Sequence, residues 1–96
     1  PFREDFVGLA AEAAQRIVDV VFRLVGVDYL SVAAFNQSGD ETHHLLLANN
    51  VLVIEGLRFN GLSCGTYQFV AVPLLLSGLD GSPCRAFIGQ ESKNAR

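Results

Sequence analysis

The chain has 96 residues, of which 50% are hydrophobic and 18% are charged, so it is long enough for one hydrophobic core and too short for two independent ones. An apolar share this high excludes an intrinsically disordered chain. The net charge is −3 and the seven Lys and Arg residues are scattered along the sequence, which argues against a nucleic-acid-binding surface because such a surface needs clustered positive charge.

The sequence also bears on membranes and cellular compartment. Its longest apolar run, residues 69–76, is eight residues long including Pro73, whereas a helix needs roughly 20 to cross a bilayer. No secretory signal pattern opens the chain. Cys64 and Cys84 form neither a C-x-x-C pair nor a disulfide framework. We therefore expect a cytoplasmic protein with free thiols.

The first predicted element is an amphipathic helix over residues 9–24. Its apolar side chains recur every three or four positions, which places them on one stripe of the helix. Residues 24–28 then predict a short buried strand that ends at Asp28. The apolar positions of the helix are Leu9, Ala13, Ile17, Val20, Val21 and Leu24.

A second helix is expected over residues 41–48. Residues 38–40 predict a turn before it, with Asp40 as the N-cap, because a short acidic side chain accepts hydrogen bonds from the unpaired amides of the first turn. Asn49 and Asn50 follow the helix and predict its end, since asparagine tolerates a positive φ.

Three further strands complete the predicted domain. The expected architecture is a single small α/β domain, with a mixed sheet of about four strands and two helices packed on it. We expect a lead-in over residues 1–7, a core over 8–89 and a polar tail over 90–96. The strands are predicted at residues 51–54, which lead to Glu55, at residues 67–76, which Pro73 interrupts, and at residues 85–88.

His43 and Glu55 are the candidate ligand residues. From His43 the helix advances about 9 Å at 1.5 Å per residue, and the following strand returns about 13 Å at 3.3 Å per residue. Both side chains should therefore lie at one edge of the sheet, together with Asp28 if the two strands are parallel. Imidazole and carboxylate groups suit zinc or manganese.

Other interpretations of these residues stay open. On spacing alone, a histidine followed by a glutamate is more often an ordinary structural pair than a metal site. His44 should face solvent, because adjacent helical residues point about 100° apart. Cys64 has no sequence neighbour that would make it a reactive thiol. The sequence contains no serine-nucleophile motif and no phosphate-binding loop.

Several short motifs, taken in order, resemble the metal-dependent cyclase family, and the nearest branch looks like bacterial kynurenine formamidase. The resemblance runs from about Phe6 to Ile88 and implies the C-terminal part of the cyclase (swivelling β/α) fold. The motifs are Leu-Val-Gly-Val-Asp-Tyr-Leu-Ser-Val at residues 24–32, Gly-Asp-Glu-Thr-His at 39–43, Val-Ile-Glu-Gly-Leu at 53–57, and Val-Pro-Leu followed by Asp-Gly-Ser-Pro-Cys-Arg-Ala within 72–86.

The resemblance implies that His43 and Glu55 match two ligands of the family's two-metal site. The family's other ligands come from an N-terminal His-x-Gly-Thr-His-x-Asp motif, and a further histidine is its acid/base. This sequence contains neither. Two ligands cannot close a zinc site, so we expect no cofactor on the isolated chain, and zinc or manganese only where the site is completed. Val21 stands where the family usually has glycine.

Two functions from different classes follow from this resemblance. One is a non-catalytic remnant that self-associates into a homo-oligomer, retains a half site and offers a pocket for a small ligand. The other is a part of a metal-dependent amide hydrolase, completed by a missing segment or a partner chain, that converts N-formylkynurenine to kynurenine and formate in tryptophan breakdown. A third arrangement would join the His43 and Glu55 residues of two subunits into one four-ligand site. We expect no nucleic-acid or membrane partner.

Overall fold

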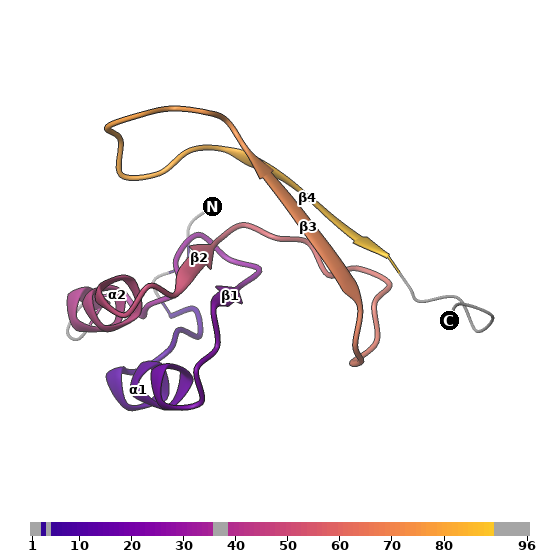
Figure 1. The fold of residues 1–96 in the computed structure, drawn as a ribbon. Helices are drawn as coiled ribbons and strands as arrows, with labels where there is room; N and C mark the ends of the chain where they lie inside the picture. Colours follow the sequence, from indigo (N-terminus) through magenta and orange to yellow (C-terminus); the bar gives the residue numbers. More distant parts are fainter. Residues whose placement is uncertain (1–2, 4, 36–38, 90–96) are drawn as a thin grey trace. The chain divides into compact units, whose positions relative to one another are not determined.

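The computed structural model describes residues 3, 5–35 and 39–89, so the predicted polar tail at 90–96 lies outside the described residues. The chain divides into two compact units, Pro1–Asn60 and Gly61–Arg96. Within the described ranges, no helix is both long and apolar enough to span a bilayer. In chain order, the elements are α1 (Ala11–Asp19), β1 (Leu24–Gly26), α2 (Gly39–Ala48), β2 (Leu52–Ile54), β3 (Gln68–Pro73) and β4 (Cys84–Gly89) (Figure 1).

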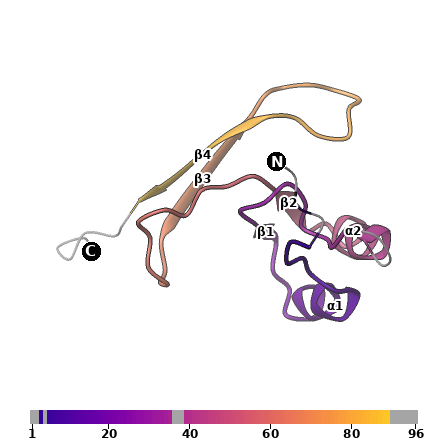
Figure 2. The ribbon, with the colours of Figure 1, turned by 180° about the vertical axis from the view of Figure 1, so that it is seen from behind.

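The first unit is built on a β-α-β connection. Strands β1 and β2 pair in parallel, with Leu24 opposite Leu52 and Val25 opposite Val53, and α2 is the crossover that such a parallel pair requires. Helix α1 precedes β1 and packs beside α2, as both views of the ribbon show (Figures 1 and 2). The prediction of a small α/β protein with two helices and four strands is confirmed.

The helices cover one face of the parallel strand pair. Val25 and Val53 pack against the core, whereas their neighbours Leu24 and Leu52 are 36% and 64% exposed, because successive strand residues point to opposite faces. The core thus lies between the two helices and one side of the strands. Its fully buried apolar members are Ala14, Val32, Ala33, Leu46 and Val51.

Gly8 and Leu9, directly after the lead-in, join this core through a close approach of two backbone segments. The Leu9 N–H donates to the Val32 carbonyl at 2.8 Å, and Leu9 forms a parallel bridge with Ala33. A Cβ atom on Gly8 would lie 2.3 Å from the Ala34 nitrogen. Only glycine therefore fits at residue 8.

Both helices of the first unit end in a left-handed residue. At the end of α2, Asn50 has a φ of 61°, as predicted, and the Val51 N–H donates to the Leu46 carbonyl at 2.9 Å. Helix α1 ends at Asp19, earlier than the predicted Leu24, because Val21 turns the chain with a φ of 67°. At the end of α1, the Phe22 N–H likewise donates to the Ile17 carbonyl at 3.2 Å, so both helix ends have the hydrogen bond of a Schellman motif.

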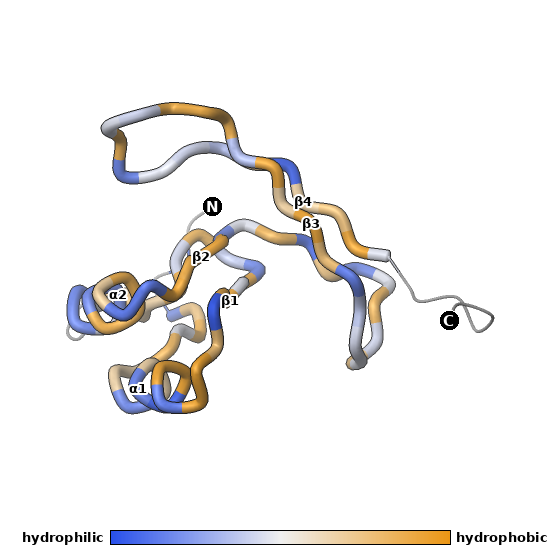
Figure 3. Tube along the Cα trace, in the orientation of Figure 1, coloured by the Kyte–Doolittle hydropathy of each residue, from blue (hydrophilic) through white to orange (hydrophobic). Residues whose placement is uncertain are grey.

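The second unit contains an antiparallel ribbon. Strands β3 and β4 pair over six positions, from Gln68 opposite Gly89 to Pro73 opposite Cys84. Hydrophobic residues lie along both strands (Figure 3). The strands among the described residues form two two-stranded sheets, and the prediction of one mixed sheet is wrong in this respect. Pairing of β3 with β4 satisfies the backbone groups along one edge of each strand, and an apolar pattern in the sequence does not specify which strand becomes the neighbour.

Candidate functional site

The structure brings His43 and Glu55 together. Helix α2 begins at Gly39, so Asp40 lies inside the first turn and not at the N-cap position predicted for it, and His43 is the fifth helical residue. Glu55 directly follows β2. The His43 Nε2 and Glu55 Oε2 atoms are 3.5 Å apart, and the two side chains are 39% and 34% exposed. The pair is thus half-buried and reachable from solvent.

A backbone amide orients the carboxylate of this pair. The Val32 N–H donates to Glu55 Oε2 at 2.9 Å, and Val32 itself is fully buried. A hydrogen bond to a charged acceptor is stronger than one between neutral groups. Glu55 Oε2 therefore accepts a hydrogen bond from the buried Val32 backbone and also faces the His43 imidazole.

Thr42 is a buried polar residue beside the pair, and the sequence-based interpretation did not include it. Its side chain is fully buried, and its hydroxyl donates to the Leu9 carbonyl at 3.0 Å. The sequence marks Thr42 only as the residue before His43 and as a member of the Gly-Asp-Glu-Thr-His motif at 39–43. Its contact with Leu9 spans 33 positions.

Asp28 lies at the same end of the parallel strands, as the topology predicted, but it does not complete a ligand set. Its neighbours bind the segment after Glu55, since the Leu57 N–H donates to the Val27 carbonyl at 3.0 Å and the Gly56 N–H to the Tyr29 carbonyl at 2.7 Å. The Asp28 residue is exposed. In the part of the chain that the structure describes, no three His, Cys, Asp or Glu residues are placed to hold one metal ion.

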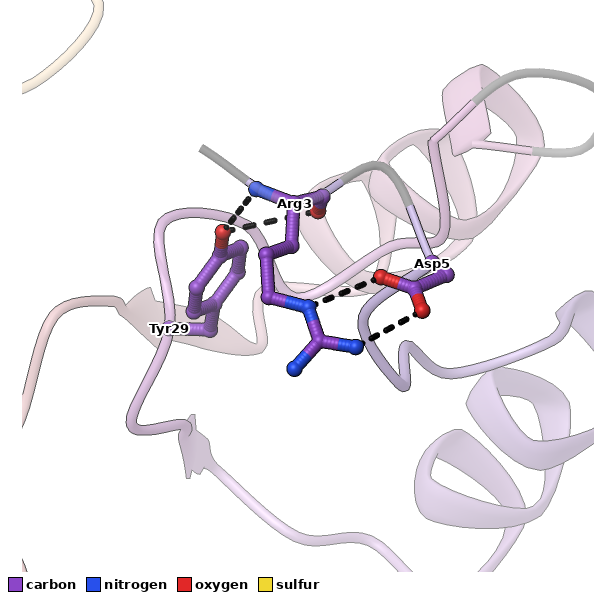
Figure 4. A network of polar contacts seen from close by, with 3 residues as sticks. All are labelled: Arg3, Asp5 and Tyr29. Carbon is purple, nitrogen blue, oxygen red and sulfur yellow. Dashed lines mark hydrogen bonds and ion pairs between the residues drawn. The ribbon is translucent and has the colours of Figure 1, made fainter. Parts of the chain in front are cut away.

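The lead-in is fastened close to these strand ends (Figure 4). The Arg3 N–H donates to the Tyr29 hydroxyl at 2.7 Å, and the Phe6 and Tyr29 ring centroids are 4.6 Å apart. The Arg3 side chain binds Asp5, with Nη2 and Oδ2 2.8 Å apart, and this hydrogen bond lowers the pKa of the exposed Asp5 carboxyl. Tyr29 thus connects the lead-in to the strand-end region that holds Glu55.

The chemistry available to this site is that of one imidazole and one carboxylate. Such a pair can form a hydrogen-bonded or ionic contact, or donate two ligands to a metal. It does not fit a resident zinc ion by itself, because structural and catalytic zinc sites take at least three protein ligands. Of the other residues considered from the sequence, His44 is exposed, as expected, and Cys64 and Cys84 are both exposed free thiols.

Sequence relatives of the chain are longer than the chain. Cyclase-like protein 3 of Oryza sativa subsp. japonica is 39% identical over 89 residues, which are 91% of this chain and 33% of that protein. The kynurenine formamidase of Maricaulis maris (strain MCS10) is 33% identical over 84 residues, which are 88% of this chain and 40% of that enzyme. The chain thus spans about a third to two fifths of the length of these curated relatives. No family model matches it.

Solved structures resemble the chain as well. The structure of a potential metal-dependent hydrolase with cyclase activity matches it with 38% identity and a TM-score of 0.84, over 91% of this chain and 43% of the other. A predicted metal-dependent hydrolase from Bacillus stearothermophilus matches with 38% identity and a TM-score of 0.83, over 91% of this chain and 42% of the other. The backbone of this chain is therefore similar to part of the backbone of each of these two proteins.

Proposed function

Because the chain belongs to the cyclase and kynurenine formamidase family over the part of that family's length that it spans, we propose that it is a non-catalytic, self-associating member that retains half of a metal site. His43 and Glu55 are the two retained ligand positions. The observation that carries this proposal is their 3.5 Å approach without a third ligand residue among those that the structure describes.

Metal content and amide hydrolysis test the non-catalytic role. We expect the purified chain, dialysed against zinc or manganese, to retain no stoichiometric metal by elemental analysis and to leave N-formylkynurenine intact. A carboxylate and an imidazole alone supply two of the three or four protein ligands that a zinc site needs. His44→Ala is the control for His43→Ala, because His44 is the neighbouring exposed histidine. Metal-dependent hydrolysis by the chain alone that His43→Ala abolishes and His44→Ala preserves would overturn the proposal.

A second candidate function is favoured by the close structural match over only 43% of a hydrolase chain. In this alternative the chain is one part of a metal-dependent amide hydrolase, and a separate polypeptide supplies the remaining ligands and the acid/base. The test mixes the chain with the portion of the Maricaulis maris kynurenine formamidase that it does not match. Formamidase activity that appears on mixing and is lost with His43→Ala and Glu55→Gln would favour this alternative over the non-catalytic role.

The hairpin β3–β4 supports the proposed self-association. Residues directly opposite each other in an antiparallel pair share a face, and one face of the hairpin carries no charged side chain. Phe69 and Ile88 on this face are 39% and 43% exposed. A two-stranded hairpin alone is marginally stable in water. We call this surface the apolar hairpin face; it consists of Phe69, Ala71, Pro73, Cys84, Ala86 and Ile88.

The occupant that we propose for the apolar hairpin face is a second copy of this chain. A two-fold contact places the same patch of both subunits together. The opposite face carries the Arg85 guanidinium group, which lies over the Phe87 ring of the same chain at 4.9 Å, so a contact on that face would also take a charge out of water. The apolar hairpin face holds no charge and therefore meets its copy without like-charge repulsion.

A pair of lysine substitutions tests this surface. Phe69→Lys places a charge on the apolar hairpin face, and we expect sedimentation equilibrium to show the mass falling to that of the monomer. Val70→Lys places the same charge on the opposite face, one residue away, and should leave the oligomer intact. A monomeric wild type, or an oligomer that survives Phe69→Lys, contradicts the proposed contact.

We also propose a cytoplasmic location. The exposed, unpaired thiols of Cys64 and Cys84 support it, because a reducing compartment keeps such cysteines free. Fractionation of cells that express the chain, followed by immunodetection, tests the location, and recovery from an oxidising compartment would contradict it.

A further inference from the structure

A chain of hydrogen bonds runs from Thr42 to Glu55 through the backbones of partly buried Leu9 and buried Val32. The Thr42 hydroxyl donates to the Leu9 carbonyl at 3.0 Å, the Leu9 N–H donates to the Val32 carbonyl at 2.8 Å, and the Val32 N–H donates to Glu55 Oε2 at 2.9 Å. These bonds connect α2 to the residue that follows β2 by a route that does not pass along the intervening chain.

The Thr42 hydroxyl binds a backbone group outside its own helix. Thr42 is the fourth residue of α2, whereas a threonine deeper in a helix commonly donates to a carbonyl of the preceding turn. Here the hydroxyl binds the backbone of Leu9, which lies outside the helix, and the Thr42 residue is fully buried. A buried hydroxyl without a hydrogen-bond partner is destabilising, so this bond holds the early part of α2 against Leu9.

His43 follows Thr42 directly, so the same contact limits where the imidazole can lie. One end of the hydrogen-bond chain holds the helical turn that carries His43, and the other end holds the oxygen of Glu55 that the imidazole approaches at 3.5 Å. We propose that Thr42 is a positioning residue that sets the separation of the His43 imidazole and the Glu55 carboxylate.

The positioning role of Thr42 concerns the proposed ligand pair His43 and Glu55, so it rests on the proposed function. Its test needs no metal and no substrate. A failed activity or metal assay therefore leaves the positioning role standing, and a failed positioning test leaves the ligand assignment standing.

Two substitutions separate the Thr42 hydroxyl from its methyl group. Thr42→Val keeps the shape of the side chain and removes the hydroxyl, whereas Thr42→Ser keeps the hydroxyl and removes the methyl group. In the isotope-labelled full chain, the readout is the nuclear Overhauser effect between the His43 ring protons and the Glu55 side-chain protons. Because this effect falls steeply as the protons separate, we expect Thr42→Val to show a loss of the His43–Glu55 signal and Thr42→Ser to retain it.

Two controls distinguish positioning from a general loss of stability. The Val32 amide should stay protected from hydrogen exchange in Thr42→Val, because its bond to Glu55 does not involve the hydroxyl. Val51→Ala leaves a cavity at a buried residue outside the hydrogen-bond chain, and it should preserve the His43–Glu55 signal although it destabilises the fold.

Each outcome decides the inference. An unchanged His43–Glu55 signal in Thr42→Val overturns it, and so does an equal loss of signal in Val51→Ala. If Thr42→Val does not fold, Thr42→Ser decides alone: a retained signal supports the role of the hydroxyl, and a lost signal contradicts it.

Discussion

At the scale of single residues, Val21 adopts a backbone conformation that its side chain disfavours. Its φ of 67° lies in the left-handed region, where a β-branched residue is strained. Asn50 has nearly the same φ, 61°, in the corresponding place at the end of α2, and asparagine tolerates this region. The ends of α1 and α2 therefore have the same backbone conformation, which is strained at Val21 and tolerated at Asn50.

The comparison of Val21 with Asn50 predicts that Val21→Gly stabilises the protein. Glycine removes a left-handed strain of about 1–2 kcal/mol, and little burial is lost because Val21 is 77% exposed. The gain should appear in urea unfolding as a higher midpoint with an unchanged slope. Asn50→Gly is the matched control and should change the free energy of unfolding by much less. A lower midpoint for Val21→Gly would show that the valine makes a compensating contact.

At the scale of elements, the sequence was sufficient for the local features and for the approach of His43 to Glu55. Helix α2 and strand β2 follow one another directly, so their known rises determine where each side chain lies along the sheet. The contact from Thr42 to Leu9 could not be predicted in this way, because its partners are 33 residues apart and no local pattern records it.

The sequence pattern also could not predict which strands pair with one another. An apolar run such as residues 69–72 predicts a strand but not the strand that it pairs with. The same run would be expected if β3 paired with β4 alone or belonged to a larger sheet. The strand itself was predicted within a few residues, as Gln68–Pro73 against residues 67–76. Only the pairing required the structure.

The junction between the lead-in and the core yields a prediction at this scale. Gly8→Ala places a Cβ atom 2.3 Å from the Ala34 nitrogen, so the two backbone segments must separate and the Leu9–Ala33 bridge weakens. We expect a loss of about 1–3 kcal/mol, as for other overpacked sites, measured by urea unfolding. Gly81→Ala is the control, since nothing lies within 4 Å of its added Cβ atom. Equal effects of the two substitutions would contradict a steric requirement at Gly8.

At the scale of the whole molecule, exposed apolar surface is the main reason to expect association between copies of the chain. Half of the residues are hydrophobic, and every described residue of β4 is exposed. The small net charge of −3 adds little repulsion between copies. Association is therefore the expected way for the chain to remove this surface from water.

If a second copy covers the apolar hairpin face, thermal stability must depend on protein concentration. Binding to the native state alone stabilises it by mass action, so the midpoint of thermal unfolding should rise with each tenfold increase in concentration. Phe69→Lys should abolish the rise and Val70→Lys should keep it. Calorimetry over a hundredfold concentration range measures it, and a constant midpoint for the wild type is the contrary result.

The residues proposed for metal ligation and for association fall on opposite sides of the boundary near Asn60. Leu9, Val32, Thr42, His43 and Glu55 precede it, and the whole hairpin follows it. A recombination breakpoint in this stretch would pass the ligand pair and the hairpin to descendants independently. Selection could then discard one capacity without touching the other, and a gene that keeps only the first unit would still encode every member of the hydrogen-bond chain.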